Sequence, residues 1–165
     1  MAEPRQAPLL VYVVDDDASI RDSLSLLLGL AGYSTRLFPD AETFIAAFDP
    51  QAAGCVVADL RLPGMSGLDL QARLRETGSR IPFVIITAHG DVPAARAAFR
   101  AEAVDFIEKP FEAAQLKAAI ESAFEQEREL SRKAEAMRVR AEMLARLTER
   151  EREVLEKAEI GRAHV

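Results

Sequence analysis

Residues 9–17 read Leu-Leu-Val-Tyr-Val-Val-Asp-Asp-Asp, an apolar run that ends on three consecutive acids. A short run that contains several β-branched residues is typical of a buried strand. Four further short apolar runs follow along the chain, and segments with helical spacing separate them. The five predicted strands are Leu9–Val14, Thr35–Phe38, Cys55–Ala58, Phe83–Thr87 and Asp105–Ile107.

The segments between these runs carry helix signals. Apolar residues recur at helical spacing from Ile20 to Ala31, Gly32 follows as a stop signal, and Asp40 and Ser66 stand where N-caps are expected. Five repeats of strand and helix predict an α/β fold, in which a doubly wound, five-stranded parallel sheet carries helices on both faces. In the flavodoxin-like strand order 2-1-3-4-5, ligands bind where the first and third strands end.

The composition bounds the class of protein. The chain has 165 residues, of which 49% are apolar, enough for one domain with a core and a small additional segment. No apolar run approaches the ~20 residues of a membrane span, and no signal peptide is visible, so we expect a cytoplasmic protein without a membrane partner. The net charge of −6 lies in residues 1–124, because acids and bases balance from residue 125 onward. Such a domain does not attract nucleic acid by its general field.

The predicted strand ends carry acids, a hydroxyl and an ammonium. Asp15–Asp17 follow the first strand, Asp59 follows the third, Thr87 ends the fourth, and Lys109 follows the fifth. Carboxylates that converge at one edge of a sheet repel one another and favour a hard divalent cation such as Mg²⁺. With a hydroxyl and an ammonium opposite, they form a cradle for a phosphoryl group, and an Asp carboxylate can itself be the nucleophile. A run of Asp after a strand is also common as a turn or a helix cap, so the joint placement carries this prediction.

Four segments at these strand ends resemble the receiver domain of two-component response regulators. They are residues 13–17 (Val-Val-Asp-Asp-Asp), 58–67 (Ala-Asp-Leu-Arg-Leu-Pro-Gly-Met-Ser-Gly), 85–93 (Ile-Ile-Thr-Ala-His-Gly-Asp-Val-Pro) and 103–111 (Ala-Val-Asp-Phe-Ile-Glu-Lys-Pro-Phe). The last two are similar to the FixJ branch of the FixJ/NarL family, whose members carry a LuxR-type output domain. The resemblance covers about residues 8–124.

The resemblance implies a phosphoacceptor and a metal site. Asp59 would accept the phosphoryl group, with Mg²⁺ as the cofactor. The metal would be held by Asp16, Asp59 and the backbone carbonyl of Arg61, and Asp15 would contact a water on the metal. Asp17, just past the acidic pair, would support these ligands from behind.

The resemblance also implies how the site reports its state. Thr87 and Lys109 would bind the phosphoryl group, and Thr87 and Phe106 would form the switch. Phe106 has no hydroxyl, so it would report by packing alone. The peptide between Lys109 and Pro110 would be cis, which suits a tight turn that aims the ammonium.

A fifth helical pattern starts at Phe111 and continues beyond the length that one domain needs. Apolar residues step by four and three along it, without Gly or Pro between positions 112 and 160. A solvated, charged linker helix and a dimerising coiled coil are both open interpretations, and the heptad spacing favours the second. The seam beyond the domain consists of Leu130, Ala134, Met137, Ala141 and Leu144.

The end of the chain has a resemblance of its own. Residues 147–155 are similar to the opening of the LuxR-type helix-turn-helix domain of FixJ-like regulators, and the resemblance then breaks off. DNA binding would therefore need a helix-turn-helix that is not complete in this chain, which we interpret as truncated before that domain. We predict four parts: a loose N-terminus (1–8), a receiver domain (9–124), a linker helix or coiled coil (125–147) and a truncated helix-turn-helix with a tail (148–165).

The favoured function is that of a two-component response regulator. A cognate sensor histidine kinase donates a phosphoryl group to Asp59, and homodimerisation through the receiver and the linker helix then controls transcription in the full-length protein. The chain is not an enzyme, apart from reactions of its own Asp. Two alternatives stay open. One is a phosphatase of the haloacid dehalogenase type, because Asp15–Asp17 contains Asp-x-Asp; the other is a receiver-only dimerisation or phosphate-sink module.

Overall fold

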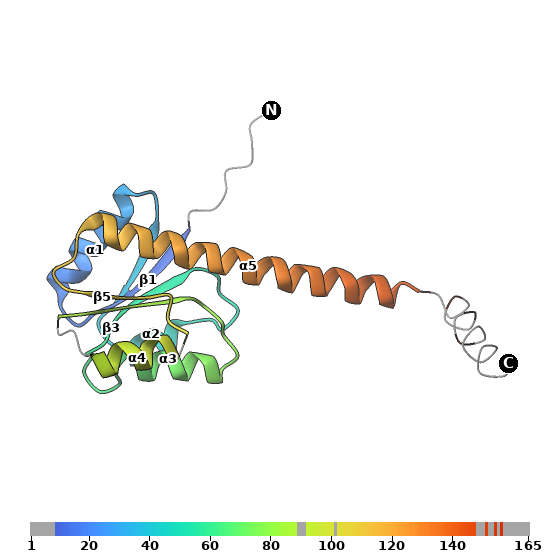
Figure 1. Cartoon of the computed structure of the whole chain (residues 1–165), viewed down its shortest axis with the longest axis horizontal. Coiled ribbons are helices and arrows are strands. Elements are labelled where there is room, and N and C mark those ends of the chain that lie inside the picture. Colours follow the sequence, from blue (N-terminus) through green and yellow to red (C-terminus); the bar gives the residue numbers. More distant parts are fainter. Residues whose placement is uncertain are drawn as a thin grey trace, which may run out of the picture. The chain divides into compact units, whose positions relative to one another are not determined.

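The computed structural model describes residues 9–88, 92–100 and 102–147, together with positions 151, 154 and 156 (Figure 1). The chain divides into two compact units, Met1–Arg128 and Glu129–Val165. The elements in chain order are β1 (Leu10–Val14), α1 (Ala18–Leu30), β2 (Ser34–Phe38), α2 (Ala41–Ala47), β3 (Cys55–Asp59), α3 (Gly67–Glu76), β4 (Phe83–Thr87), α4 (Val92–Arg100), β5 (Asp105–Glu108) and α5 (Ala113–Ala145).

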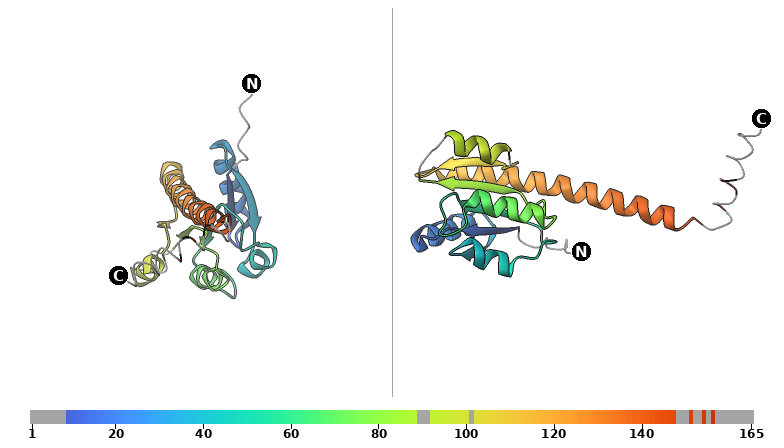
Figure 2. Two further views of the ribbon diagram at one scale, coloured as in Figure 1. Left: turned by 90° about the vertical axis from the view of Figure 1, so that its right-hand side faces the viewer. Right: turned by 90° about the horizontal axis from the view of Figure 1, so that it is seen from below.

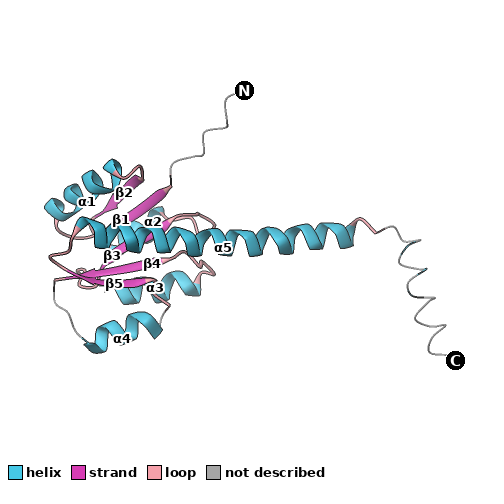
Figure 3. Ribbon diagram, turned by 45° about the horizontal axis from the view of Figure 1, so that its top comes forward, coloured by secondary structure: helices cyan, strands magenta, loops and turns pink. Residues whose placement is uncertain are grey.

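The strands form one parallel sheet in the order β2-β1-β3-β4-β5, which confirms the predicted fold class (Figure 3). Every residue of β3 and β4 is buried, as expected for inner strands covered on both faces. The edge strand β2 buries only Phe38. The predicted strand ends differ from the observed ones by one residue at most; for example, Asp59 is the last residue of β3 instead of the first after it.

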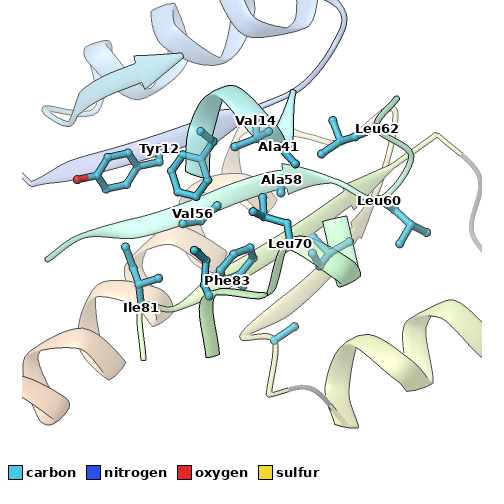
Figure 4. Packing of buried hydrophobic residues seen from close by; sticks show 14 of the residues in the cluster. Tyr12, Val14, Ala41, Val56, Ala58, Leu60, Leu62, Leu70, Ile81 and Phe83 are labelled. Atoms are coloured by element: carbon cyan, nitrogen blue, oxygen red, sulfur yellow. The ribbon is translucent and has the colours of Figure 1, made fainter. Parts of the chain in front are cut away.

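Two apolar layers lie on the two faces of the sheet, because successive side chains of a strand point to opposite sides. Val11 and Val13 pack with residues of α1 and the first half of α5. Tyr12 and Val14 pack with residues of α2, α3 and α4 (Figure 4). Figure 2 shows the same arrangement, with α1 and α5 on one face and the other helices opposite. Cys55 lies fully buried in the α1/α5 layer.

Helices α1, α2 and α3 begin or end at the predicted signals. The Asp40 side chain accepts a hydrogen bond from the Thr43 N–H at the start of α2. Ser66 and Asp69 form a capping box at the start of α3. Gly32 follows α1 with a φ of +93°, a backbone conformation that glycine adopts at little cost. Asp91, which stands before Pro93 where the sequence predicts the cap of the fourth helix, lies outside the described residues.

Helix α5 begins at Ala113, two residues after the predicted start at Phe111. Its first turns bury apolar side chains in the core, namely Leu116, Ala119, Ile120, Ala123 and Phe124. From Ser131 to Arg146 every residue is exposed. Residues 148–151 (Thr-Glu-Arg-Glu) have the sequence pattern of a capping box but lie mostly outside the described residues, and the boundaries after 124 and 147 remain predictions. Among the described residues, no helix combines the length and hydrophobicity that a membrane span requires.

Candidate functional site

Three carboxylates meet at the carboxyl edge of the sheet, between β1 and β3. Asp15 directly follows β1 and is fully buried, Asp59 ends β3 and is 8% exposed, and Asp16 is exposed. One carboxylate oxygen from each of the three lies within 4.8 Å of the others. The position is the switch point of the strand order, where doubly wound sheets bind their ligands. Three negative charges this close repel one another, so a cation is needed to stabilise the arrangement.

Lys109 supplies one such cation from the end of β5. Its ammonium donates to Asp15 Oδ2 over 2.8 Å and to Asp59 Oδ2 over 3.0 Å. The Lys109 side chain is only 15% exposed, and burial by itself would lower its pKa. The hydrogen bonds to both carboxylates and their charges outweigh burial and raise the pKa of Lys109 above its ordinary value. The ammonium therefore stays charged and holds Asp15 and Asp59 together.

Asp59 has bonding partners on both carboxylate oxygens. Oδ1 accepts the backbone N–H of Arg61 over 3.0 Å, and Oδ2 accepts Lys109. Burial raises the pKa of Asp59 above its ordinary value, although the Arg61 N–H and Lys109 act in the opposite direction. Each carboxylate oxygen can accept a further bond, so Asp59 retains lone pairs for another ligand or for an incoming electrophile.

Thr87 joins the fourth strand end to the fifth. It is the last residue of β4 and is fully buried. Its carbonyl oxygen accepts the backbone N–H of Lys109 over 2.7 Å, so that the two predicted phosphoryl-binding residues share one backbone hydrogen bond. The peptide bond between Lys109 and Pro110 is cis, the isomer that the resemblance implies.

Phe106 occupies the middle of β5, where its backbone is in register with Ile85 of β4. Its side chain is half-buried and packs against the apolar layer under α2, α3 and α4. A phenyl ring makes no hydrogen bond with its side chain, so apolar packing alone holds the ring in place. The switch role of Phe106 remains a prediction.

The Asp17 carboxylate is not part of the acidic cluster, but the Asp17 backbone N–H donates to Asp15 Oδ1 over 2.9 Å, so the supporting role expected for Asp17 remains a prediction. It is the N-cap of α1, and its carboxylate accepts the N–H and the hydroxyl of Ser19. These hydrogen bonds lower the pKa of Asp17. The general tendency of Asp to cap the helix after a strand explains this residue, whereas Asp15 and Asp16 point to the site.

Two residues near the site have contacts that the sequence pattern did not predict. Gly67, the first residue of α3, approaches the backbone of the acceptor so closely that a Cβ would lie 2.5 Å from the carbonyl oxygen of Asp59. A glycine at the first position of a capped helix is poor for helix formation, which is a signal for such a close approach. Arg21 donates a side-chain hydrogen bond to the carbonyl of Asp15, and the sequence alone cannot reveal a contact of this kind.

The donor set fits a hard divalent cation. The three acids offer carboxylate oxygens only, which favour Mg²⁺ over softer metals. Asp16 is the most accessible of the three, and its carboxylate has no hydrogen bond to any described residue. The chemistry of the cluster therefore agrees with the predicted cofactor, while the ligand set Asp16, Asp59 and the Arg61 carbonyl remains a prediction.

Residues 11–121 match the response regulator receiver domain family. This match spans most of the chain, and the chain belongs to that family. The regulators of two-component systems are thus the class that the fold and the site define.

Two relatives of this kind match long stretches of the chain. The transcriptional regulatory protein FixJ of Bradyrhizobium diazoefficiens is 45% identical over 146 residues, which are 88% of this chain and 71% of that protein. The response regulator protein TodT of Pseudomonas putida is 42% identical over 114 residues, 69% of this chain and 50% of that protein.

Solved structures agree with these relatives. The response regulator StyR has a TM-score of 0.85 at 41% identity, covering 92% of this chain and 77% of that chain. Full-length FixJ from B. japonicum has a TM-score of 0.71 at 43% identity, covering 94% of this chain and 77% of that chain. These likenesses agree with the FixJ branch to which the sequence motifs pointed.

Proposed function

We propose that this response regulator accepts a phosphoryl group on Asp59 from a sensor histidine kinase and thereby controls transcription through dimerisation. The observation that carries the proposal is the single ammonium of Lys109 between the carboxylates of Asp15 and Asp59. That contact supports the proposal because it brings the carboxylate of Asp59, a positive charge and the acidic cluster close together at the switch point of the sheet.

The transfer step requires an unprotonated Asp59. One of its oxygens attacks the phosphorus of the kinase's phosphohistidine, an O–P bond forms, and the P–N bond breaks with its electron pair going to the histidine nitrogen. The Lys109 ammonium, which already contacts Asp59 Oδ2, then pairs with the negative charge on the phosphoryl oxygens. Thr87 is buried and is joined to Lys109 by a backbone hydrogen bond. In this proposal its hydroxyl donates a hydrogen bond to another oxygen of the phosphoryl group.

Asp16, Asp59 and the carbonyl of Arg61 would hold Mg²⁺ at this edge, with Asp15 acting through a water. When bound, the metal supplies positive charge that neutralises the acids and the phosphoryl oxygens. Without the metal, the chain itself has to keep the three carboxylates close together. Lys109 does so through Asp15 and Asp59, while Asp16 remains open to solvent.

The signal leaves the site through β4 and β5. Thr87 and Lys109 share a backbone hydrogen bond, so that a movement of either displaces the other. Phe106 lies three residues before Lys109 on β5, and its half-buried ring can repack when the strand end shifts. The surface of α4 and β5 changes with it and alters the dimer preference, which is a local charge event biasing a two-state element.

The exposed part of α5 suits a conditional dimer. Met137 and Leu144 are 73% and 58% exposed, so the apolar seam of the second unit is largely open to solvent. In a parallel pair with these residues at d positions, Lys133 at g faces Arg138 of the partner subunit at e. Like charges at the rim oppose pairing by at most a few tenths of a kcal/mol, since Arg138 also pairs with Glu135 and Glu142 of its own helix. We therefore expect the seam to pair only when the two receiver domains also associate.

The names of the relatives support the part of the proposal that concerns transcription. FixJ carries the name transcriptional regulatory protein, and this chain spans 71% of its length in B. diazoefficiens. The predicted opening of a helix-turn-helix at residues 147–155 lies mostly outside the described residues. In this proposal α5 couples the receiver to that DNA-binding output.

The phosphatase alternative loses its main support. It requires Asp15 and Asp17 to act together as Asp-x-Asp, but Asp17 caps α1 and bonds to Ser19. The relatives are named as regulators instead of hydrolases. The other alternative, a receiver-only dimerisation or phosphate-sink module, would use the same phosphorylation chemistry and would differ only in having no DNA-binding domain to control.

Intact-mass analysis after incubation with acetyl phosphate and Mg²⁺ tests the proposal. We expect one added phosphoryl group on the wild-type chain, none without metal, and none on the matched Asp59→Asn variant. Light scattering of the same chains, with and without beryllofluoride as a phosphoryl mimic, measures the fraction of dimer. An unchanged mass in the folded wild type contradicts the acceptor, and an unchanged oligomer contradicts the coupling.

A further inference from the structure

Arg21 lies in the first turns of α1, directly behind the acidic loop of residues 15–17. Its Nη1 donates to the backbone carbonyl oxygen of Asp15 over 2.6 Å. Its own backbone N–H donates to the carbonyl oxygen of Asp17 over 3.1 Å. The side chain is half-buried. Arg21 is thus bonded to both ends of the loop that carries the first two acids.

The bond from Arg21 completes the hydrogen bonding of Asp15. The backbone N–H of Asp15 donates to Phe38 O over 3.1 Å. Oδ1 accepts the N–H of Asp17 over 2.9 Å, and Oδ2 accepts Lys109. The carbonyl oxygen is the remaining polar atom, and it faces the guanidinium. The residue is therefore fixed from four directions, which suits a buried carboxylate at a functional site.

Asp16 contrasts with Asp15. It is exposed, and among the described residues its carboxylate has no hydrogen bond or ion pair, yet it lies in the cluster with Asp15 and Asp59. Its direction therefore depends on its backbone. The peptide group that joins Asp15 to Asp16 is the one whose carbonyl Arg21 holds.

We propose that Arg21 is a positioning residue for the cation site, which fixes the Asp15–Asp16 peptide and so directs the Asp16 carboxylate toward the metal. The inference rests on the proposed metal-dependent function of the acidic cluster. A guanidinium suits this task because its hydrogen bonds are charge-assisted and its planar fork has a fixed geometry. It donates to a carbonyl and leaves the carboxylate oxygens available for a cation.

Position and charge predict opposite effects for the loss of Arg21. A positive charge beside a cation site repels Mg²⁺, so by charge alone its removal tightens binding. If Arg21 acts by position, its removal loosens Asp16 and weakens binding. The sign of the change in Mg²⁺ affinity therefore separates the two roles.

The experiment compares Arg21→Met with Arg21→Lys and with the control Arg73→Met. Arg73 is exposed on α3 and makes no ion pair with any described residue, so its variant measures the loss of one charge alone. Mg²⁺ dissociation constants are measured by NMR titration of the unphosphorylated chain, and melting temperatures report folding. We expect about tenfold weaker Mg²⁺ binding in Arg21→Met, the size found for groups that orient metal ligands. Arg21→Lys should recover part of the loss, and Arg73→Met should match the wild type.

Equal or tighter Mg²⁺ binding in folded Arg21→Met overturns the inference. If that variant does not fold, Arg21→Lys decides, and wild-type affinity in it counts against a geometric role of the guanidinium. Phosphorylation of the wild type by acetyl phosphate is measured in parallel. Failure of that reaction with Mg²⁺ still bound contradicts the proposed function alone, since the ranking of Mg²⁺ affinities still tests Arg21.

Discussion

The ammonium of Lys109 lies 2.8 Å from Oδ2 of Asp15, although the two residues are 94 positions apart in the chain. Asp15 is fully buried, and a buried carboxylate is stable only when it is paired and hydrogen-bonded. The ion pair between Lys109 and Asp15 therefore helps to stabilise the arrangement of the end of β5 next to the end of β1. The same contact draws in Asp59 and makes the site a structural element as well as a functional one.

Lys109→Met should destabilise the chain by about 3 kcal/mol, because it leaves the buried carboxylate of Asp15 without its cation. Urea unfolding in the absence of divalent cations measures the change. Saturating Mg²⁺ should reduce the loss, since a metal at the cluster replaces part of the positive charge. Lys117→Met, on an exposed position of α5, serves as the control. Equal stability of the two variants would show that the pair contributes nothing.

Asp59→Asn should raise the melting temperature at neutral pH by a few degrees when no metal is present. The pKa of Asp59 is raised in the folded chain because burial disfavours its charged form. Its contribution to stability is therefore present below the unfolded pKa and is lost as the pH rises through the folded pKa. The asparagine variant avoids that loss.

The advantage of Asp59→Asn should shrink as the pH falls toward the ordinary aspartate pKa of 3.8. Calorimetry of both chains at a series of pH values measures the difference directly. Asp22→Asn, an exposed position on α1, controls for the removal of one negative charge. A stabilisation that is independent of pH contradicts the assigned cause.

Gly67→Ala should destabilise the chain and slow phosphorylation, because the new Cβ would lie 2.5 Å from the carbonyl oxygen of Asp59. The turn between β3 and α3 has to shift, at a cost of about 2 kcal/mol. Gly29→Ala is the matched control: nothing lies within 4 Å of its added Cβ, and it stands inside α1. That variant should gain up to about 1 kcal/mol. The prediction fails if both substitutions change stability in the same direction.

Lys133→Glu should strengthen dimerisation through the exposed seam of α5. It replaces a like-charge contact with Arg138 of the partner subunit by an attractive one on each side of a parallel pair. Two rim contacts that each change by about 0.5 kcal/mol lower the dimer dissociation constant by about fivefold. Sedimentation equilibrium at low salt measures the constant. Arg146→Glu makes the same charge change on the side of the helix away from the seam; an equal effect there would exclude this pairing.

The sequence was sufficient to predict the sheet and the cluster for a physical reason. In a parallel sheet all carboxyl ends lie at one edge, so residues that follow strands, such as Asp59 and Lys109, must come together once the strands are recognised. The alternation of apolar runs is strong because the inner strands are buried on both faces.

The remaining features depend on contacts that no periodicity encodes. Asp17 has the same side chain as its two neighbours, and only the direction of the chain at the start of α1 makes it a cap. Arg21 acts on a backbone carbonyl, and Gly67 is required by a backbone approach. The heptad seam is continuous in sequence, but its early positions, including Leu116 and Ile120, are used by the core.

The central claim is that Asp59 itself carries the phosphoryl group, and borohydride trapping tests it most directly. The chain is incubated with acetyl phosphate and Mg²⁺, reduced with borohydride, digested and sequenced by tandem mass spectrometry. Reduction of an aspartyl phosphate yields homoserine, and we predict homoserine at position 59, dependent on Mg²⁺. Homoserine at Asp15, Asp16 or Asp17 instead of position 59, or at no position in a folded chain, would contradict the account.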